Sequence, residues 1–309
     1  MMIYEYALEP TVLAAWASND RDYAEFLREY GLGTPRLVSS FPKKKVSKLR
    51  SYLLQHSPQD TQSLSGRRYI EMVAKLTESV VIRDVADHKS SVWSEAVVSE
   101  DDRAPFGVIL SSSAIRAKNN ITPDSMYLQG TIWNHYNQLN IQRTNAGLLS
   151  VVGNLVRLST KYIVIIDPFG WSDEAIGFVR CMINSILSNR LADELPKIIL
   201  FYKEKRGSKN AGSGSPAADH VKDRVMKDLN GELGGLQFEV FELREAAGSD
   251  VFHNRCILTE HGGVLTGHGI GVSNNEAHTD EAILMRAEIY QKKLLQFIED
   301  KCFDIVSMA

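Results

Sequence analysis

Apolar residues in the first hundred positions recur mostly at the three- and four-residue spacing of an amphipathic helix. Five of them share one helical stripe between residues 11 and 30: Leu13, Trp16, Tyr23, Phe26 and Leu27. This stripe predicts a helix that Gly31 and Gly33 end. A short strand is expected before it at residues 3–7, and further helices at residues 43–55, 65–81 and 93–100. The pattern predicts a mainly helical N-terminal region over residues 1–105.

The pattern changes at Phe106, where short β-branched runs begin to alternate with helical segments. Strands are expected at residues 107–111, 162–166, 197–202, 237–241 and 253–259. Helices are expected at residues 148–158, 173–187, 217–229 and 287–300. Strands separated by helices predict a parallel or mixed sheet with helices on both faces. We therefore expect an α/β domain over residues 106–309.

Composition narrows the class of protein. Of the 309 residues, 44% are hydrophobic and 24% are charged, which is typical of a globular protein. No apolar run reaches the ~20 residues that cross a bilayer, and the first ten residues, with Glu5 and Glu9, do not resemble a signal peptide. The three cysteines form no CxxC pair, which indicates neither a zinc site nor a disulfide framework. We expect a cytoplasmic protein with no membrane partner, no metal and no cofactor.

The formal net charge is -3, so a nucleic-acid site would have to be a local basic patch. Residues 36–50 contain six basic residues and no acidic one, and two arginines begin the next predicted helix. Either this is a solvated helix face, or it is a surface that contacts nucleic-acid phosphates. The residues of this basic surface are Arg36, Lys43, Lys44, Lys45, Lys48, Arg50, Arg67 and Arg68.

The segment with the clearest chemistry is residues 250–272, DVFHNRCILTEHGGVLTGHGIGV. On a strand, His253 and Arg255 would point to the same side, because they are two positions apart. A guanidinium clamps a phosphate through two hydrogen bonds, and an imidazole can attack it or transfer a proton. A turn at residues 262–263 leads to a second strand. At its end, Gly267 and Gly269 would let backbone N–H groups approach an anion.

This segment resembles the phospholipase D superfamily, whose motif is H-x-K, four residues, D, six residues and G-S-x-N. The spacing is kept here, while Arg stands for Lys, Glu for Asp, His for Ser and Ile for Asn. The matching positions are His253, Arg255, Glu260, Gly267, His268 and Ile270. With the strand end IDPF at residues 166–169, the sequence looks like a bacterial group of phospholipase-D-like proteins related to the C-terminal domains of MIT-domain proteins. The resemblance covers roughly residues 140–300.

The resemblance implies a phospholipase-D-like fold and phosphodiester chemistry that needs no metal. Active members pair two motifs, from one chain or from a homodimer, so that one His attacks phosphorus and the other protonates the leaving group. One motif is present here. The resemblance puts His253, Arg255, Glu260 and His268 at its catalytic positions, and Arg255, Gly267 and Gly269 at the phosphate. It implies recognition of nucleic-acid phosphodiesters, rather than their turnover, in a bacterial anti-phage defence complex.

Other interpretations stay open at this point. One is a homodimeric, metal-independent nuclease with His253 as nucleophile. Another is a scaffold that docks a helicase or ATPase partner through its N-terminal region. The motif side chains also have structural interpretations: His253 as a core histidine, Arg255 as the ion-pair partner of Asp167 or Glu260, and His268 as the cap of a turn.

Overall fold

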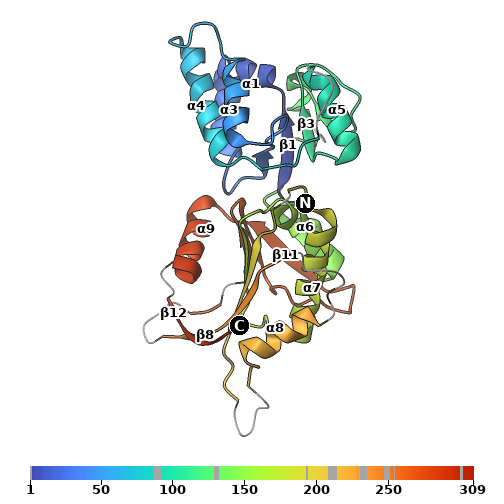
Figure 1. Cartoon of the computed structure of the whole chain (residues 1–309), viewed down its shortest axis with the longest axis vertical. Coiled ribbons are helices and arrows are strands. Elements are labelled where there is room, and N and C mark those ends of the chain that lie inside the picture. Colours follow the sequence, from blue (N-terminus) through green and yellow to red (C-terminus); the bar gives the residue numbers. More distant parts are fainter. Residues whose placement is uncertain are drawn as a thin grey trace. The chain divides into compact units, whose positions relative to one another are not determined.

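The computed structural model divides the chain into two compact units, residues 2–136 and residues 137–309 (Figure 1). The residues that it describes are 2–86, 92–128, 132–192, 194–207, 214–227, 229, 235–246, 251–253, 255–299 and 302–309.

The N-terminal unit contains a four-stranded parallel sheet. Its strands are β1 (Tyr4–Leu8), β2 (Arg36–Val38), β3 (Val108–Leu110) and β4 (Asn120–Ile121), in the order β2-β1-β3-β4. The predicted strand at residues 107–111 exists, but it pairs with β1, with Tyr6 opposite Val108. The unit boundary therefore lies at residues 136–137 instead of 105–106, and the N-terminal unit is itself α/β. Hydrophobic spacing cannot reveal this, because a strand's partner is chosen by contacts distant in the sequence.

The helices of this unit are α1 (Pro10–Ala17), α2 (Asp20–Glu29), α3 (Val46–Leu54), α4 (Leu64–Glu78) and α5 (Trp93–Arg103). The single helix predicted over residues 11–30 is two helices. Asn19 separates them, since its side chain accepts hydrogen bonds from the N–H groups of Arg21 and Asp22 and so caps α2. Two hydrophobic cores form on opposite faces of β1, where Tyr6 belongs to the larger core and Ala7 to the smaller.

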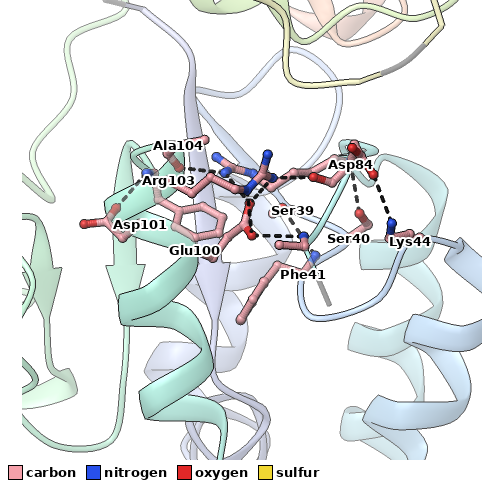
Figure 2. A network of polar contacts seen from close by, with 12 residues as sticks. Ser39, Ser40, Phe41, Lys44, Asp84, Glu100, Asp101, Arg103 and Ala104 are labelled. Atoms are coloured by element: carbon pink, nitrogen blue, oxygen red, sulfur yellow. Dashed lines mark hydrogen bonds and ion pairs between the residues drawn. The ribbon is translucent and has the colours of Figure 1, made fainter. Parts of the chain in front are cut away.

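A buried ionic network ties β1 to α5 in this unit. The guanidinium of Arg83 donates to Glu5 at 2.7 and 2.9 Å and to Glu100 at 3.0 Å, and all three side chains are fully buried. Figure 2 shows the part of this network around Glu100 and Arg103 of α5. Burial lowers the pKa of Arg83, but hydrogen bonds and attraction from the two carboxylates outweigh it and leave the pKa raised. Removing one partner would leave an uncompensated buried charge.

The C-terminal unit is built on an eight-stranded mixed sheet in the order β12-β8-β7-β6-β9-β10-β11-β5. The strands are β5 (Gln138–Gln142), β6 (Tyr162–Ile166), β7 (Lys197–Lys203), β8 (Phe238–Glu245), β9 (Cys256–Thr259), β10 (Gly262–Thr266), β11 (Thr279–Leu284) and β12 (Phe303–Met308). β6, β7 and β8 run parallel, and β9 is antiparallel to β6. The predicted α/β class and the mixed sheet are confirmed.

Helices lie on both faces of this sheet, with α9 (Ala287–Leu294) on one side and α7 (Asp173–Asn189) and α8 (Ala218–Met226) on the other (Figure 1). α6 (Asn145–Arg157) packs on α7. The predicted helix at residues 287–300 is shorter than expected: a π-helical turn, Leu295–Glu299, follows α9. The chain then ends in the edge strand β12. No described helix is both long enough and apolar enough to cross a membrane.

Candidate phosphate site at one edge of the C-terminal sheet

Three neighbouring strands, β6, β9 and β10, bring candidate site residues together where the strands end on one side of the C-terminal sheet. Cys256 of β9 lies opposite Ile166 of β6 on one side and Leu265 of β10 on the other, and both pairings are antiparallel. The residues directly after β6, before β9 and after β10 therefore meet at the same edge. They are Asp167, Arg255 and Gly267.

Two arginines hold the loop that follows β10. Nη1 of Arg255 donates to the carbonyl oxygen of Gly267 at 2.9 Å, and Nη2 of Arg143 donates to that of Gly271 at 3.0 Å. Arg143 follows β5, at the far end of the strand order, and its backbone N–H bonds to the carbonyl of His278. Both guanidiniums are thus fixed by the protein while further N–H groups remain on each of them.

Two buried carboxylates hold the backbone N–H groups of the same loop. Oδ2 of Asp280 accepts from the N–H of His268 at 3.0 Å, and Oδ2 of Asp167 accepts from that of Ile270 at 2.8 Å. Oδ1 of Asp167 also accepts from the N–H of Phe169 at 2.8 Å. Burial raises the pKa of Asp167, and the two backbone hydrogen bonds and Arg255 oppose the rise only in part.

A pocket of about 420 Å³ lies beside this loop. It contains two arginines and two histidines, with one buried carboxylate, Asp167, and one exposed carboxylate, Glu174. The lining residues are Arg143, Asp167, Phe169, Ser172, Glu174, Arg255, His268, Gly271, Val272, Ser273 and His278. The guanidinium carbon of Arg255 lies 5.4 Å from the centre of the Phe169 ring, a cation–π contact.

The glycines of the loop permit these close contacts. Gly269 has a φ of 76°, and a Cβ there would lie 2.0 Å from Oδ2 of Asp167. A Cβ at Gly267 would lie 2.6 Å from Oδ1 of Asp280. Gly267 and Gly269 were expected to offer their backbone N–H groups to a phosphate. The N–H of Gly267 already donates to the carbonyl of Glu281, so it is not available for that role.

His268 lines the pocket with its imidazole. Its side chain is 57% exposed, and Nδ1 lies 3.4 Å from Oδ1 of Asp280, whose own side chain is 3% exposed. The second pocket histidine, His278, uses both ring nitrogens: Nδ1 lies 2.8 Å from Oγ of Ser273 and Nε2 lies 3.2 Å from Nδ2 of Asn275.

His253 lies elsewhere. It precedes β9 and is not part of the strand, so the two-residue alternation that would align it with Arg255 does not apply. The side chain is exposed, is absent from the described lining of the pocket, and acts electrostatically on Glu245 at the end of β8. Within one chain, Arg255 shares its pocket with His268 instead of His253.

Glu260 also lies away from the pocket, at the opposite end of β9 from Arg255. Its carboxylate accepts hydrogen bonds from Oγ of Ser159 at 2.6 Å and from the N–H groups of Thr160 and Lys161 at 2.6 and 3.0 Å. This side chain anchors the connection into β6 and lies outside the described lining of the pocket around Arg255. The hairpin turn is also at residues 260–261 instead of 262–263, because Gly262 already pairs with Thr259.

The basic surface predicted in the N-terminal unit is divided by the structure. Arg36 is buried, where it bonds to Glu29 at 3.0 Å and lies 4.0 Å from the centre of the Trp133 ring, so it cannot contact nucleic acid. Others already have partners: Lys43 lies over the Tyr52 ring, Lys44 pairs with Asp84, and Arg68 pairs with Asp20. The exposed members are Lys44, Lys45, Lys48, Arg50 and Arg67.

The site contains residues that sequence reasoning missed as ligands, above all Arg143 and Asp280. Their strands, β5 and β11, were not predicted. β5 consists mainly of polar residues, and in β11 the buried Asp280 interrupts the alternation of apolar and polar residues that marks a strand. No three His, Cys, Asp or Glu side chains in the described ranges gather as a metal site. No protein-family model and no curated protein matches the sequence.

Proposed function

We propose that the pocket around Arg255 binds a phosphodiester group of nucleic acid. The observation that carries this proposal is the pair of guanidiniums, Arg143 and Arg255, each fixed by a backbone carbonyl at the rim of one pocket. A fixed guanidinium that keeps free N–H groups matches the two oxygens of a phosphate and loses little conformational freedom on binding.

The charges around the pocket favour an anion. Two arginines face it, whereas one of its two carboxylates, Asp167, is 2% exposed and has a raised pKa because it is buried. The oxygens of Asp167 point to backbone N–H groups of the protein. These two N–H donors offset part of the negative charge of Asp167.

Phe169 favours nucleic acid over a free phosphate ion. Phe169 is 52% exposed, although it lines the same pocket and its ring lies beneath the guanidinium of Arg255. An exposed aromatic ring beside a phosphate clamp can stack on a base, and such stacking is largely independent of sequence. The exposed basic residues of α3 and α4 in the N-terminal unit, such as Lys48 and Arg67, are a separate candidate for salt-dependent contacts with a nucleic-acid backbone.

The proposed cellular setting, a bacterial anti-phage defence complex with a helicase or ATPase partner, is supported only by the likeness to phospholipase-D-like proteins. The homodimeric nuclease with His253 as nucleophile would need two chains, because one chain does not bring His253 to the pocket of Arg255.

Fluorescence anisotropy with labelled 20-nucleotide DNA and RNA tests the proposal. Arg255→Gln removes a charge-assisted contact worth roughly 1.5–3 kcal/mol, so affinity should fall by about tenfold or more. Arg286→Gln is the matched control. This exposed arginine follows the end of β11, which pairs with the start of β10. It therefore lies at the opposite end of these strands from the loop that follows β10. Equal affinities of the two variants would contradict the proposal.

A further inference from the structure

His268 is held in the arrangement of a general base. Its backbone N–H donates to Oδ2 of Asp280 at 3.0 Å, and its Nδ1 faces Oδ1 of the same carboxylate at 3.4 Å. The carboxylate is itself fixed, because Oδ1 also accepts the N–H of Glu281 at 2.8 Å. Both the main chain and the ring of His268 are therefore oriented by one buried acid.

The carboxylate determines which ring nitrogen is available. An acceptor beside Nδ1 keeps the proton on that nitrogen, which leaves the lone pair on Nε2. In the part of the chain that the structure describes, Nε2 of His268 has no hydrogen-bond partner, and the residue lines the same pocket as Arg255. When Nε2 gains a proton, the charge of Asp280 stabilises the imidazolium.

The close approach of Asp280 has a specific structural origin. A Cβ at Gly267 would lie 2.6 Å from Oδ1 of Asp280, so only glycine leaves room for the carboxylate beside the loop. The same Gly267 carbonyl accepts the hydrogen bond of Arg255. Arg255 is thus held by Gly267, and His268, held by Asp280, is the next residue of the same loop.

We propose that His268, oriented by Asp280, is a catalytic residue for hydrolysis of the phosphodiester held by Arg143 and Arg255. Nε2 takes a proton from water, the water oxygen forms a bond to phosphorus, and the bond from phosphorus to the leaving oxygen breaks. The electron pair leaves with that oxygen, which takes up a proton, and His268 returns to its neutral form. One water is consumed, and a phosphate monoester and an alcohol are formed.

The inference rests on the proposed function, because the substrate occupies the same pocket. The probe is bis(4-nitrophenyl) phosphate, a diester whose leaving group departs as a coloured anion without needing a proton. The full chain should hydrolyse it, and His268→Gln should lower kcat/KM by roughly a hundredfold or more. Asp280→Asn keeps one acceptor oxygen, and we expect it to retain the fold and lose roughly tenfold in kcat/KM.

The pH dependence of the rate distinguishes a catalytic role of His268 from a merely structural one. The rate of the wild-type chain should fall on the acid side as Nε2 becomes protonated, and His268→Gln should lose this acid limb. His220→Ala is the matched control: this exposed histidine of α8 is absent from the described lining of the pocket, and the variant should keep both the rate and the profile. Absence of hydrolysis by the wild-type chain, or an unchanged rate and profile in His268→Gln, overturns the inference.

Oligonucleotide binding distinguishes the two possible failures. If Arg255→Gln weakens binding and the wild-type chain hydrolyses nothing, only the catalytic inference fails. If Arg255→Gln leaves binding unchanged, the proposed phosphodiester site fails, and the catalytic inference fails with it.

Discussion

Nη1 of Arg255 donates to the carbonyl oxygen of Gly267 at 2.9 Å, across the β9–β10 hairpin. The two residues are twelve positions apart in the sequence, and the antiparallel pairing places them at the same end of the two strands. The contact fixes the guanidinium before a ligand binds, which lowers the entropic cost of binding.

Gly269→Ala should destabilise the C-terminal unit by about 2 kcal/mol or more, because alanine disfavours a positive φ and its Cβ would collide with Asp167. Gly271→Ala is the control: the added Cβ would meet no heavy atom within 4 Å. Urea denaturation of both variants measures the difference. Equal midpoints would contradict the close packing of the loop against Asp167.

Glu260→Gln should lower stability and leave oligonucleotide affinity unchanged, because Glu260 anchors residues 159–161 at the opposite end of β9 from Arg255. Burial raises the pKa of Glu260, but His261 and the hydrogen bonds from Ser159 and Thr160 outweigh it and leave the pKa lowered. A lowered pKa gives stability that is present above the unfolded pKa of about 4.3.

That contribution of Glu260 is lost as the pH falls through the folded-state pKa. The stability difference between Glu260→Gln and the wild-type chain should therefore shrink on acidification below about pH 4. Urea titrations at several pH values measure it. A loss of nucleic-acid affinity in this variant, with the fold intact, would instead restore Glu260 to the binding site.

The residues that sequence reasoning placed well are those whose role depends on local pattern. The strand Tyr162–Ile166 was predicted from its run of apolar residues. The glycines of the loop after β10 were predicted from their positions at the end of a strand. Arg255 was singled out from its spacing, and the structure places it in the lining of the pocket, while its role as a phosphate ligand stays a prediction.

The places of Arg143 and His253 could not be predicted from the sequence, because they depend on strand pairing between distant segments. Arg143 reaches the pocket only because β5 pairs with β11 at the far edge of the sheet. The assumption that His253 lies on a strand failed because β9 begins at Cys256. Strand order and strand ends are tertiary properties, so the periodicity of one segment does not determine them.

His135 should make the N-terminal unit less stable in mild acid. Burial, together with repulsion from Arg36, lowers the pKa of His135 from 6.5 to about 3. Its ring is stacked on Tyr4 at 4.0 Å, and Nε2 meets the hydroxyl of Tyr6. The unfolded chain therefore takes up a proton that the folded unit does not, and stability falls between about pH 6.5 and pH 3.

For one proton the slope is at most about 1.4 kcal/mol per pH unit. His135→Gln should reduce the slope in this window. Tryptophan fluorescence during urea unfolding measures it, since three of the four tryptophans, Trp16, Trp93 and Trp133, lie in the N-terminal unit. The same pH dependence in the variant and in the wild-type chain would show that His135 is not kept neutral by the fold.

The most direct test of the phosphate site is the salt dependence of single-stranded oligonucleotide binding, measured for the wild-type chain and for the double variant Arg143→Gln/Arg255→Gln. Each phosphate contact contributes about 0.7 to the slope of log K against log salt concentration for single strands. Two lost contacts should reduce the magnitude of the slope by about 1.4 and weaken binding at low salt. A double variant with the wild-type slope and affinity would contradict a phosphodiester site built on Arg143 and Arg255.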